Sequence, residues 1–286
     1  MRLGDGGDNF EDRTGHSGMS FGGGLGGGIF GMLLPLILSR FGIIGLLILG
    51  LGYCALTSLG GGGGGGLLGG GSGTSPATQG TSTITPEQRR VISGSVASTQ
   101  QVWSEIFQQA GAQYTPPQLV AYTQGTRSGC GEAQATMGPF YCPTDQKIYI
   151  DPSFFDELTR RFGAPGDFAQ AYVVAHEVGH HVQNLEGKLG GASNSNQQQV
   201  AIELQADCYA GVWAARARDA QGQLLEPGDV EEGMRAAEAI GDDTLQRQSQ
   251  GVVVPDSFTH GSSAQRMEAL RRGLQTGNPG SCNYSG

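Results

Sequence analysis

His176, Glu177 and His180 form the pattern H-E-x-x-H, and their types and spacing could support hydrolytic chemistry. In a helix, residues four apart lie on one face about one turn apart, so both imidazoles can reach the same metal ion. Zn²⁺ is well suited to two histidines at this spacing. Glu177 lies beside this pair, where it could take a proton from a zinc-activated water. The pattern therefore predicts His176 and His180 as zinc ligands and Glu177 as the general base.

The residues before this motif indicate that its helix is buried. Residues 171–175 read Ala-Tyr-Val-Val-Ala, and such an apolar stretch is typical of a core helix. Two histidines and a glutamate in a buried helix need partners, because unpaired polar groups are costly to remove from water. A metal ion supplies that partner. Histidines that are satisfied by hydrogen bonds in the core are the alternative.

A catalytic zinc site usually has three protein ligands and one position open for water. The downstream candidates for the third ligand are His181, Glu186, Glu203, Asp207 and His260. His181 points about 100° away from His180 around the helix, which makes it a poor ligand. Glu203 and Asp207 lie four residues apart on an otherwise apolar helix. We expect Glu203 to bind the metal and Asp207 to accept a hydrogen bond from a ligand histidine. A buried salt bridge, for example between Asp207 and Arg266, is the alternative.

The elements that must position these residues are mostly helices. The helices are expected at about 85–110, 151–158, 168–184, 198–218 and 262–273, with another that begins at 229. Strands are expected within 114–122, at 140–142 and at 147–150, and the last two form a hairpin. The pattern predicts an α+β fold that is mostly helical with a small sheet.

The first third of the chain differs sharply from the rest, because 27 of the 51 glycines precede residue 76. Residues 1–28 are polar and glycine-rich, and we expect a flexible tail. Residues 29–59 are almost wholly apolar, and residues 41–59 carry no charge over nearly the roughly 20 residues that cross a bilayer. We expect a transmembrane anchor at 29–59, with a buried core helix as the alternative. Residues 60–84 are a Gly/Ser/Thr-rich linker, and residues 85–286 form the zinc-binding domain.

Basic residues set the expected orientation of this anchor. Arg2, Arg13 and Arg40 precede the apolar stretch, and the next basic residue after it is Arg89. We therefore expect a single-pass protein of the cell membrane, with its N-terminus in the cytoplasm and the domain outside. The net charge of −9 argues against a nucleic-acid partner, which would require a basic face.

The domain contains four cysteines, Cys130, Cys142, Cys208 and Cys282. An even number in an exported domain indicates two disulfides. One pairing joins Cys130 to Cys142 in a short loop and leaves Cys208 for Cys282. The sequence does not fix this choice, and four free thiols are the alternative.

H-E-x-G-H followed by a helix with E-x-x-A-D resembles the zincin metallopeptidases whose third ligand is a glutamate. The chain is more closely similar to the bacterial neutral zinc metallopeptidase family in four segments. These are Gly-Pro-Phe-Tyr-Cys-Pro at 138–143, His-Glu-Val-Gly-His-His-Val-Gln at 176–183, Glu-Leu-Gln-Ala-Asp-Cys at 203–208 and His-Gly-Ser-Ser-Ala-Gln-Arg at 260–266. The resemblance covers the tail, the anchor and nearly all of 85–286. It implies a zincin-like domain and a zinc-dependent peptidase.

The resemblance also implies roles for three further parts of the chain. By analogy with related membrane zincins, Arg266 would pair with Asp207, and His260 would be catalytic by donating to the developing oxyanion. A surface histidine before a helix is the alternative for His260. Residues 147–150 resemble the edge strand along which zincins bind an extended substrate, and an ordinary hairpin strand is the alternative.

We therefore expect a membrane-anchored zinc endopeptidase that acts on a peptide or protein substrate. One alternative is another zinc amidohydrolase that acts on cell-wall peptides, because zinc and a glutamate base can serve any amide bond. Another is a non-catalytic envelope interaction protein that binds zinc for stability. The presence of Glu177 argues against this last alternative, since a structural site needs no general base.

Overall fold

The computed structural model describes residues 1–4, 6–15, 82–189 and 195–284. The predicted anchor at 29–59 and nearly all of the predicted linker at 60–84 lie outside these residues. Within the described residues, no helix is both long enough and apolar enough to cross a bilayer.

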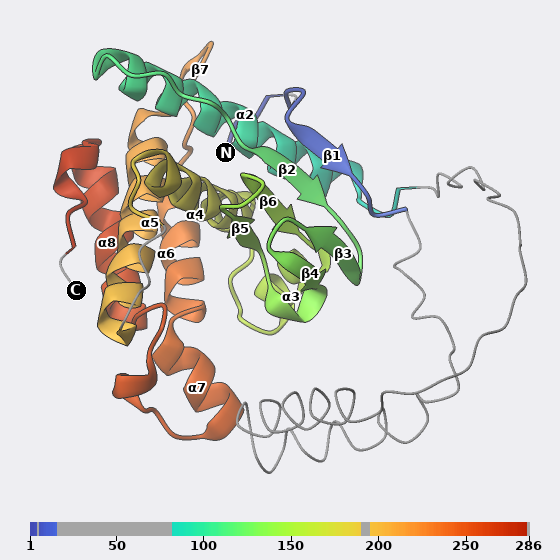
Figure 1. Ribbon diagram of the computed structural model, residues 1–286, viewed down its shortest axis with the longest axis vertical. Helices are drawn as coiled ribbons and strands as arrows, with labels where there is room; N and C mark the ends of the chain where they lie inside the picture. The colour runs from blue at the N-terminus through green and yellow to red at the C-terminus, as the bar shows by residue number, and fades with distance from the viewer. Residues whose placement is uncertain (5, 16–81, 190–194, 285–286) are drawn as a thin grey trace, which may run out of the picture. The chain divides into compact units, whose positions relative to one another are not determined.

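The described part of the chain is mixed α and β and mostly helical, as predicted (Figure 1). Its helices are α2 (Pro86–Gln109), α3 (Ser153–Arg160), α4 (Asp167–Leu185), α5 (Asn196–Arg216), α6 (Asp229–Ala239), α7 (Asp242–Gln250) and α8 (Ser263–Thr276). Each predicted helix is present, and its ends differ from the prediction by a few residues. Helix α7 was not predicted.

Local sequence determines where two of these helices begin. The Thr85 hydroxyl accepts a hydrogen bond from the Gln88 N–H, and Pro86 occupies the first position of α2. Ser262 and Gln265 make the equivalent reciprocal bonds at the start of α8. These capping boxes satisfy backbone groups that the first turn of a helix leaves without a partner.

The main sheet has four strands in the order β1-β2-β6-β5. They are β1 (Phe10–Asp12), β2 (Gln118–Ala121), β6 (Lys147–Ile150) and β5 (Phe140–Cys142). The strands β1, β2 and β6 are parallel, and β5 is antiparallel to β6. Two small hairpins pair β3 (Gly125–Ser128) with β4 (Gly131–Gln134) and β7 (Arg218–Asp219) with β8 (Gly222–Gln223).

The predicted hairpin of β5 and β6 is confirmed, but the prediction that 147–150 is an edge strand is wrong. Strand β6 lies between β2 and β5, and the edge strands are β1 and β5. A hairpin has two edges, and its own sequence does not say which one a distant strand will cover. Here β2 pairs with β6 and leaves β5 at the edge.

The prediction of a flexible tail over 1–28 is wrong for the described residues before residue 16. Strand β1 pairs with β2, and Met1 and Leu3 are buried in the main core. The Thr83 N–H donates to Thr14 Oγ1 at 3.0 Å. A strand of three residues surrounded by glycines gives no periodic signal, because its stability comes from pairing with residues about a hundred positions away. The described residues form one compact unit.

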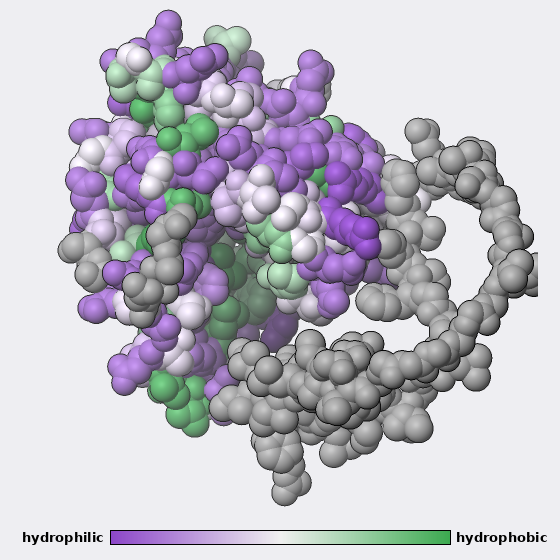
Figure 2. Space-filling view, viewed as in Figure 1, coloured by the Kyte–Doolittle hydropathy of each residue, from purple (hydrophilic) through white to green (hydrophobic). Residues whose placement is uncertain are grey.

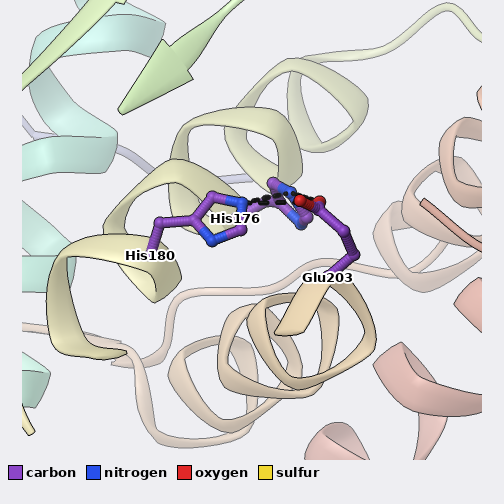
Figure 3. A group of neighbouring side chains, drawn as sticks. All are labelled: His176, His180 and Glu203. Atoms are coloured by element: carbon purple, nitrogen blue, oxygen red, sulfur yellow. Dashed lines mark hydrogen bonds and ion pairs between the residues drawn. The ribbon is translucent and has the colours of Figure 1, made fainter. Parts of the chain in front are cut away.

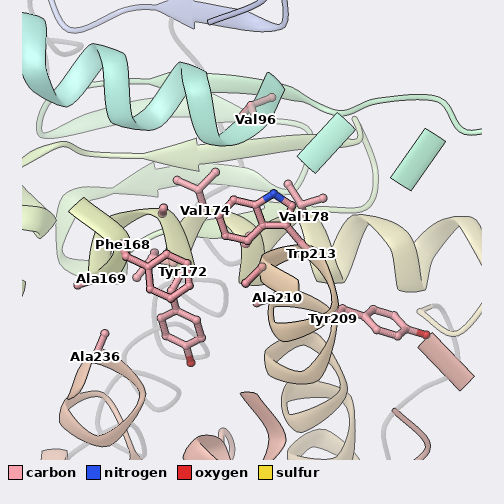
Figure 4. Close-up of a cluster of buried hydrophobic side chains, with 14 of the residues drawn as sticks. Val96, Phe168, Ala169, Tyr172, Val174, Val178, Tyr209, Ala210, Trp213 and Ala236 are labelled. Carbon is pink, nitrogen blue, oxygen red and sulfur yellow. The ribbon is translucent and has the colours of Figure 1, made fainter. Parts of the chain in front are cut away.

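Helices α2, α4, α5 and α6 enclose the apolar core (Figure 4). The Phe168 and Trp213 rings stack with their centroids 6.0 Å apart, which ties α4 to α5. Helices α4 and α5 also cross closely at Gly179. A Cβ atom at this position would lie 2.9 Å from the Ala206 Cα, closer than atoms can pack. Glycine at 179 therefore lets the two helices come close enough for their polar side chains to meet.

The C-terminal helix is held against α5 in the same way. A Cβ at Gly273 would lie 2.0 Å from the Cys208 carbonyl oxygen, so only glycine allows α8 to approach this closely. The disulfide between Cys208 and Cys282 lies beside this contact, and a second one joins Cys130 to Cys142. The pairing that the short loop suggested is confirmed.

Candidate metal centre

The three predicted metal ligands point toward one another from two facing helices (Figure 3). His176 Nε2 and His180 Nε2 on α4 lie 3.2 Å and 3.4 Å from Glu203 Oε2 on α5. The two imidazole nitrogens are 3.1 Å apart. Ligand atoms of a tetrahedral zinc ion at about 2.0–2.1 Å would be about 3.3 Å from one another. The donor set and its spacing therefore fit Zn²⁺.

Asp207 holds the first of these histidines. Its Oδ1 is 2.7 Å from His176 Nδ1, and its carboxylate also accepts two bonds of 2.9 Å from Arg266. The Tyr172 hydroxyl donates to the same Oδ1 at 2.6 Å. The predicted hydrogen bond to a ligand histidine is present, and so is the salt bridge that was its alternative. Asp207 and Arg266 are both buried, so each neutralises a charge that would otherwise be costly.

This carboxylate strongly affects the protonation of the site. Burial opposes the charged imidazole, but the Asp207 and Glu203 carboxylates outweigh it and raise the pKa of His176 to about 10. Burial also opposes ionisation of Asp207, yet Arg266 and His176 hold its pKa well below the ordinary value. Asp207 is therefore a charged acceptor that fixes the Nδ1–H of His176 and leaves Nε2 facing Glu203.

His180 is held by a neutral side chain instead. Its Nδ1 is 2.9 Å from Gln183 Oε1, one helical turn further along α4. Gln183 is completely buried. Both histidines thus use Nδ1 to contact the protein and Nε2 to face the metal position, but only His176 has a carboxylate partner at Nδ1.

Glu177 is buried next to the ligands, and its Oε2 has no hydrogen-bond partner among the described residues. Burial raises its pKa above that of an ordinary glutamate. A buried carboxylate oxygen without a partner is costly, and a water or substrate group at the metal position would satisfy it. This is the arrangement that a general base requires.

The ligands and Glu177 open onto a cleft of about 590 Å³. Its apolar lining comes from Met137, Phe140, Phe154, Phe162, Val173, Leu189, Ile202, Ile240 and Leu245. Figure 2 shows a hollow with apolar atoms at its base between polar surfaces. Strand β5 contributes Phe140 and Tyr141 to one side of this cleft. The cleft can accept an apolar side chain next to the metal position.

His260 lies on the same cleft, with 53% of its side chain exposed. Its Nδ1 is 3.3 Å from Asp242 Oδ1 and 3.0 Å from the Thr259 hydroxyl. Asp242 Oδ2 also accepts the backbone N–H groups of Thr259, His260 and Gly261, which fixes the loop before α8. His260 thus faces the site without belonging to the group of metal ligands.

The other candidate ligands lie elsewhere. His181 is buried on another face of α4, where its Nδ1 is 3.0 Å from the Tyr141 hydroxyl and its Nε2 donates to the Thr115 carbonyl. Glu186 accepts a bond from the Tyr209 hydroxyl. As the helical geometry predicted, His181 is not part of the metal group.

Three residues at the site were not predicted from the sequence, namely Tyr172, Gln183 and Asp242. Two of them carried a usable signal. Tyr172 is four residues before His176, and Gln183 is three residues after His180, so each lies on the ligand face of α4. Asp242 gave no such signal, because its relation to His260 depends on the path of the chain between α6 and α8.

Comparison with known proteins also indicates a zinc peptidase. The sequence model of the family described as "Putative neutral zinc metallopeptidase" matches residues 1–284. The uncharacterized protein YpfJ of Escherichia coli is 49% identical over 220 residues, which cover 73% of this chain and 76% of that protein. An uncharacterized protein of Mycobacterium bovis is 45% identical over 183 residues, which cover 59% of this chain and 62% of that protein. No solved structure matches the chain.

Proposed function

The chain belongs to the neutral zinc metallopeptidase family, and from this premise we propose that it is a zinc-dependent endopeptidase. The observation that carries the proposal is the group of His176, His180 and Glu203, whose ligand atoms are spaced for one tetrahedral ion. Beside it lies the unpartnered carboxylate of Glu177. A zinc site that served stability alone would gain nothing from this buried, unpaired oxygen.

His176, His180 and Glu203 would hold the ion. Zinc bound there supplies Lewis acidity to the attacking water and to the scissile carbonyl. Glu177 takes the water proton on Oε2 and later delivers it to the leaving amine. Asp207 keeps the Nδ1 proton on His176 throughout, because Arg266 neutralises its charge and holds it in place. His260 reaches the cleft from the loop before α8 and donates to the oxygen on which negative charge develops.

The edge strand β5 is the proposed binding site for the substrate backbone. It lines the cleft, and its second edge is not covered by another strand of the described sheet. An extended peptide can add to such an edge through main-chain hydrogen bonds. Pro139 and Pro143 flank β5 and have no N–H to donate, which confines the pairing to Phe140–Cys142.

Hydrogen bonds between the N-terminal residues and residues 82–83 favour a membrane topology that differs from the sequence prediction. The Ser82 hydroxyl donates to Asp12 Oδ2 at 2.7 Å, and the Thr83 N–H donates to Thr14. A single membrane crossing through 29–59 would put these bonded residues on opposite sides. We propose that the N-terminal residues and the domain lie on the same side of the membrane. The apolar stretch would attach the protein there.

The two disulfides favour the outer side, because disulfides persist in oxidising compartments. A reporter that is active only outside the cytoplasm, fused after Gly286, should be active. Asp8 is exposed, so Asp8→Cys in a Cys54→Ser background should react with an impermeant maleimide in intact cells. If this cysteine reacts only after lysis while the reporter is active, the same-side proposal is wrong.

The peptidase proposal is tested with purified, zinc-loaded protein on casein and on a library of unstructured peptides. The parent should cleave both. Glu177→Gln keeps the shape of the side chain and should retain zinc, but turnover should fall by about 10²–10⁴-fold because the base is lost. A parent protein that binds zinc and cleaves neither substrate would contradict the proposal. Cleavage of cell-wall peptides alone would replace it with the amidohydrolase alternative.

A further inference from the structure

A chain of buried amide groups runs from the second metal ligand to the C-terminal segment. Gln183 Oε1 lies 2.9 Å from His180 Nδ1, and Gln183 Nε2 donates to Gln205 Oε1 at 3.1 Å. Gln205 Nε2 then donates to the Cys282 carbonyl oxygen at 2.7 Å. Both glutamine side chains are buried between α4, α5 and the residues that follow α8. Cys282 is covalently joined to Cys208 on α5.

The chain has only one consistent direction, because its far end is a backbone carbonyl, which can only accept. Gln205 must therefore present its NH₂ group to Cys282 and its oxygen to Gln183. Gln183 must present its NH₂ group to Gln205, which leaves its own oxygen facing His180. Only the tautomer of His180 with the proton on Nδ1 can donate to that oxygen. Its Nε2 lone pair is then directed toward the metal position.

Gln183 makes a second contact that fixes its orientation independently. Its Nε2 also donates to the Ile202 carbonyl at 2.7 Å. Ile202 immediately precedes the third ligand, Glu203, on α5. One side chain thus contacts a ligand on α4 and the backbone beside a ligand on α5. A change at Gln183 would affect both the tautomer of His180 and the distance between the two helices at the site.

We propose that Gln183 and Gln205 are positioning residues that set the tautomer of His180, and that the disulfide between Cys208 and Cys282 anchors the far end of their hydrogen-bond chain. The inference rests on the proposed zinc site. It assigns a role to the C-terminal segment, which contributes no ligand. Gln183 would then do for His180 what Asp207 does for His176, but without a charge.

The test compares the zinc affinity of variants by chelator competition. Methionine is close to glutamine in shape and cannot complete the hydrogen-bond chain. Gln183→Met should weaken zinc binding by about 10–100-fold, the usual effect of removing the partner of a ligand histidine. Gln205→Met should weaken it less, because Gln183 retains its bond to Ile202. The matched control is Gln170→Met on α4. Gln170 Oε1 is buried and has no hydrogen-bond partner among the described residues. The Gln170→Met variant should therefore bind zinc as tightly as the parent.

A second readout separates positioning from general stability. Nitrogen chemical shifts of the His180 ring in the zinc-loaded parent should show the proton on Nδ1 and the metal on Nε2. In Gln183→Met, the Nδ1 signal should shift and broaden because its proton loses the buried acceptor. Gln205→Met should show a smaller change, and Gln170→Met should show none. The Cys208→Ser/Cys282→Ser variant should lose zinc affinity in the same direction. The inference is wrong if Gln183→Met and Gln205→Met bind zinc as tightly as the Gln170→Met control.

Failure of this inference is distinguishable from failure of the proposed function. If the parent protein binds no zinc, the proposed metal site itself is wrong. A parent that binds zinc without cleaving peptides contradicts the peptidase alone, since the affinity comparison needs no turnover. If Gln183→Met does not fold, Gln205→Met tests the same chain from a position that does not touch a ligand.

Discussion

The two walls of the cleft are built in different ways. The ligand wall consists of α4 and α5, which cross at Gly179 and place every ligand on a buried helix. The strand wall consists of residues 137–143 and includes β5, an edge strand of the sheet. Each wall has its own disulfide. Most buried polar groups of the ligand wall are paired within it, with Glu177 Oε2 as the exception beside the ligands, whereas the strand wall has a free edge.

Hydrogen bonds to the Tyr141 hydroxyl connect the two walls. His181 on α4 accepts a hydrogen bond from the Tyr141 hydroxyl of β5, and the same hydroxyl accepts one from Asn184. The edge strand is therefore fixed at a set distance from the ligand helix while its outer edge stays available. This difference indicates that the ligand wall determines metal affinity and the strand wall determines substrate affinity. The following predictions test this division.

The largest effect should come from the ligands themselves. His176→Ala, His180→Ala and Glu203→Ala should each abolish stoichiometric zinc binding, because two remaining ligands form an incomplete site. Metal content after dialysis, measured by elemental analysis, checks this prediction. Full zinc occupancy in Glu203→Ala would show that another residue, such as Asp207 or His260, supplies the third ligand.

Asp207→Asn should have the next largest effect, a loss of about 10–100-fold in zinc affinity with the fold retained. Asparagine keeps the shape of the side chain but carries no charge to hold His176 and Arg266. Asp242→Asn is the matched control, since its carboxylate contacts His260 and no ligand. Unchanged affinity in Asp207→Asn would reduce Asp207 to a structural partner of Arg266, and complete loss would make it a ligand.

Zinc affinity should also rise with pH. Metal-free His176 has a pKa raised to about 10, so below that pH zinc must displace a proton from it. Displacing this proton alone makes the affinity increase about tenfold per pH unit between about pH 6 and 8, and the raised pKa of His180 makes the dependence steeper. Asp207→Asn removes a carboxylate that raises this pKa, and its slope should be shallower. Chelator competition at several pH values measures both slopes, and a pH-independent affinity in the parent would contradict the prediction.

The ligand wall was also the part of the molecule that the sequence predicted best. The spacing of His176 and His180 is set by helical geometry, which acts over a few residues and is visible in the sequence. Glu203 was predicted because a carboxylate on an otherwise apolar helix needs a partner. The short loop between Cys130 and Cys142 suggested one of the possible disulfide pairings, and the structure has that pairing. Each of these features leaves a signal within a few residues of sequence, so local patterns were enough to find them.

The parts that were mispredicted depend on contacts between distant segments. Strand β1 is stable because it pairs with β2, and β6 is internal because β2 covers it. The sequence at 147–150 is the same whether β6 is central or at the edge. The spacing of Gln183 from His180 is visible in the sequence, but its contacts with Ile202 and Gln205 depend on how α5 packs against α4.

The smallest predicted effect concerns the strand wall. Cys130→Ser/Cys142→Ser removes the disulfide that joins the end of β5 to the loop between β3 and β4. The edge strand should become less well ordered, and the substrate would have to order it on binding. We expect KM for a peptide substrate to rise by a few-fold, with kcat and zinc affinity close to parental values. Tyr141 still contacts His181 and Asn184 in this variant, which is why the effect should be modest. Cys208→Ser/Cys282→Ser is the reciprocal control, because it should weaken zinc binding instead. Loss of zinc in the Cys130→Ser/Cys142→Ser variant would show that the two walls are not independent.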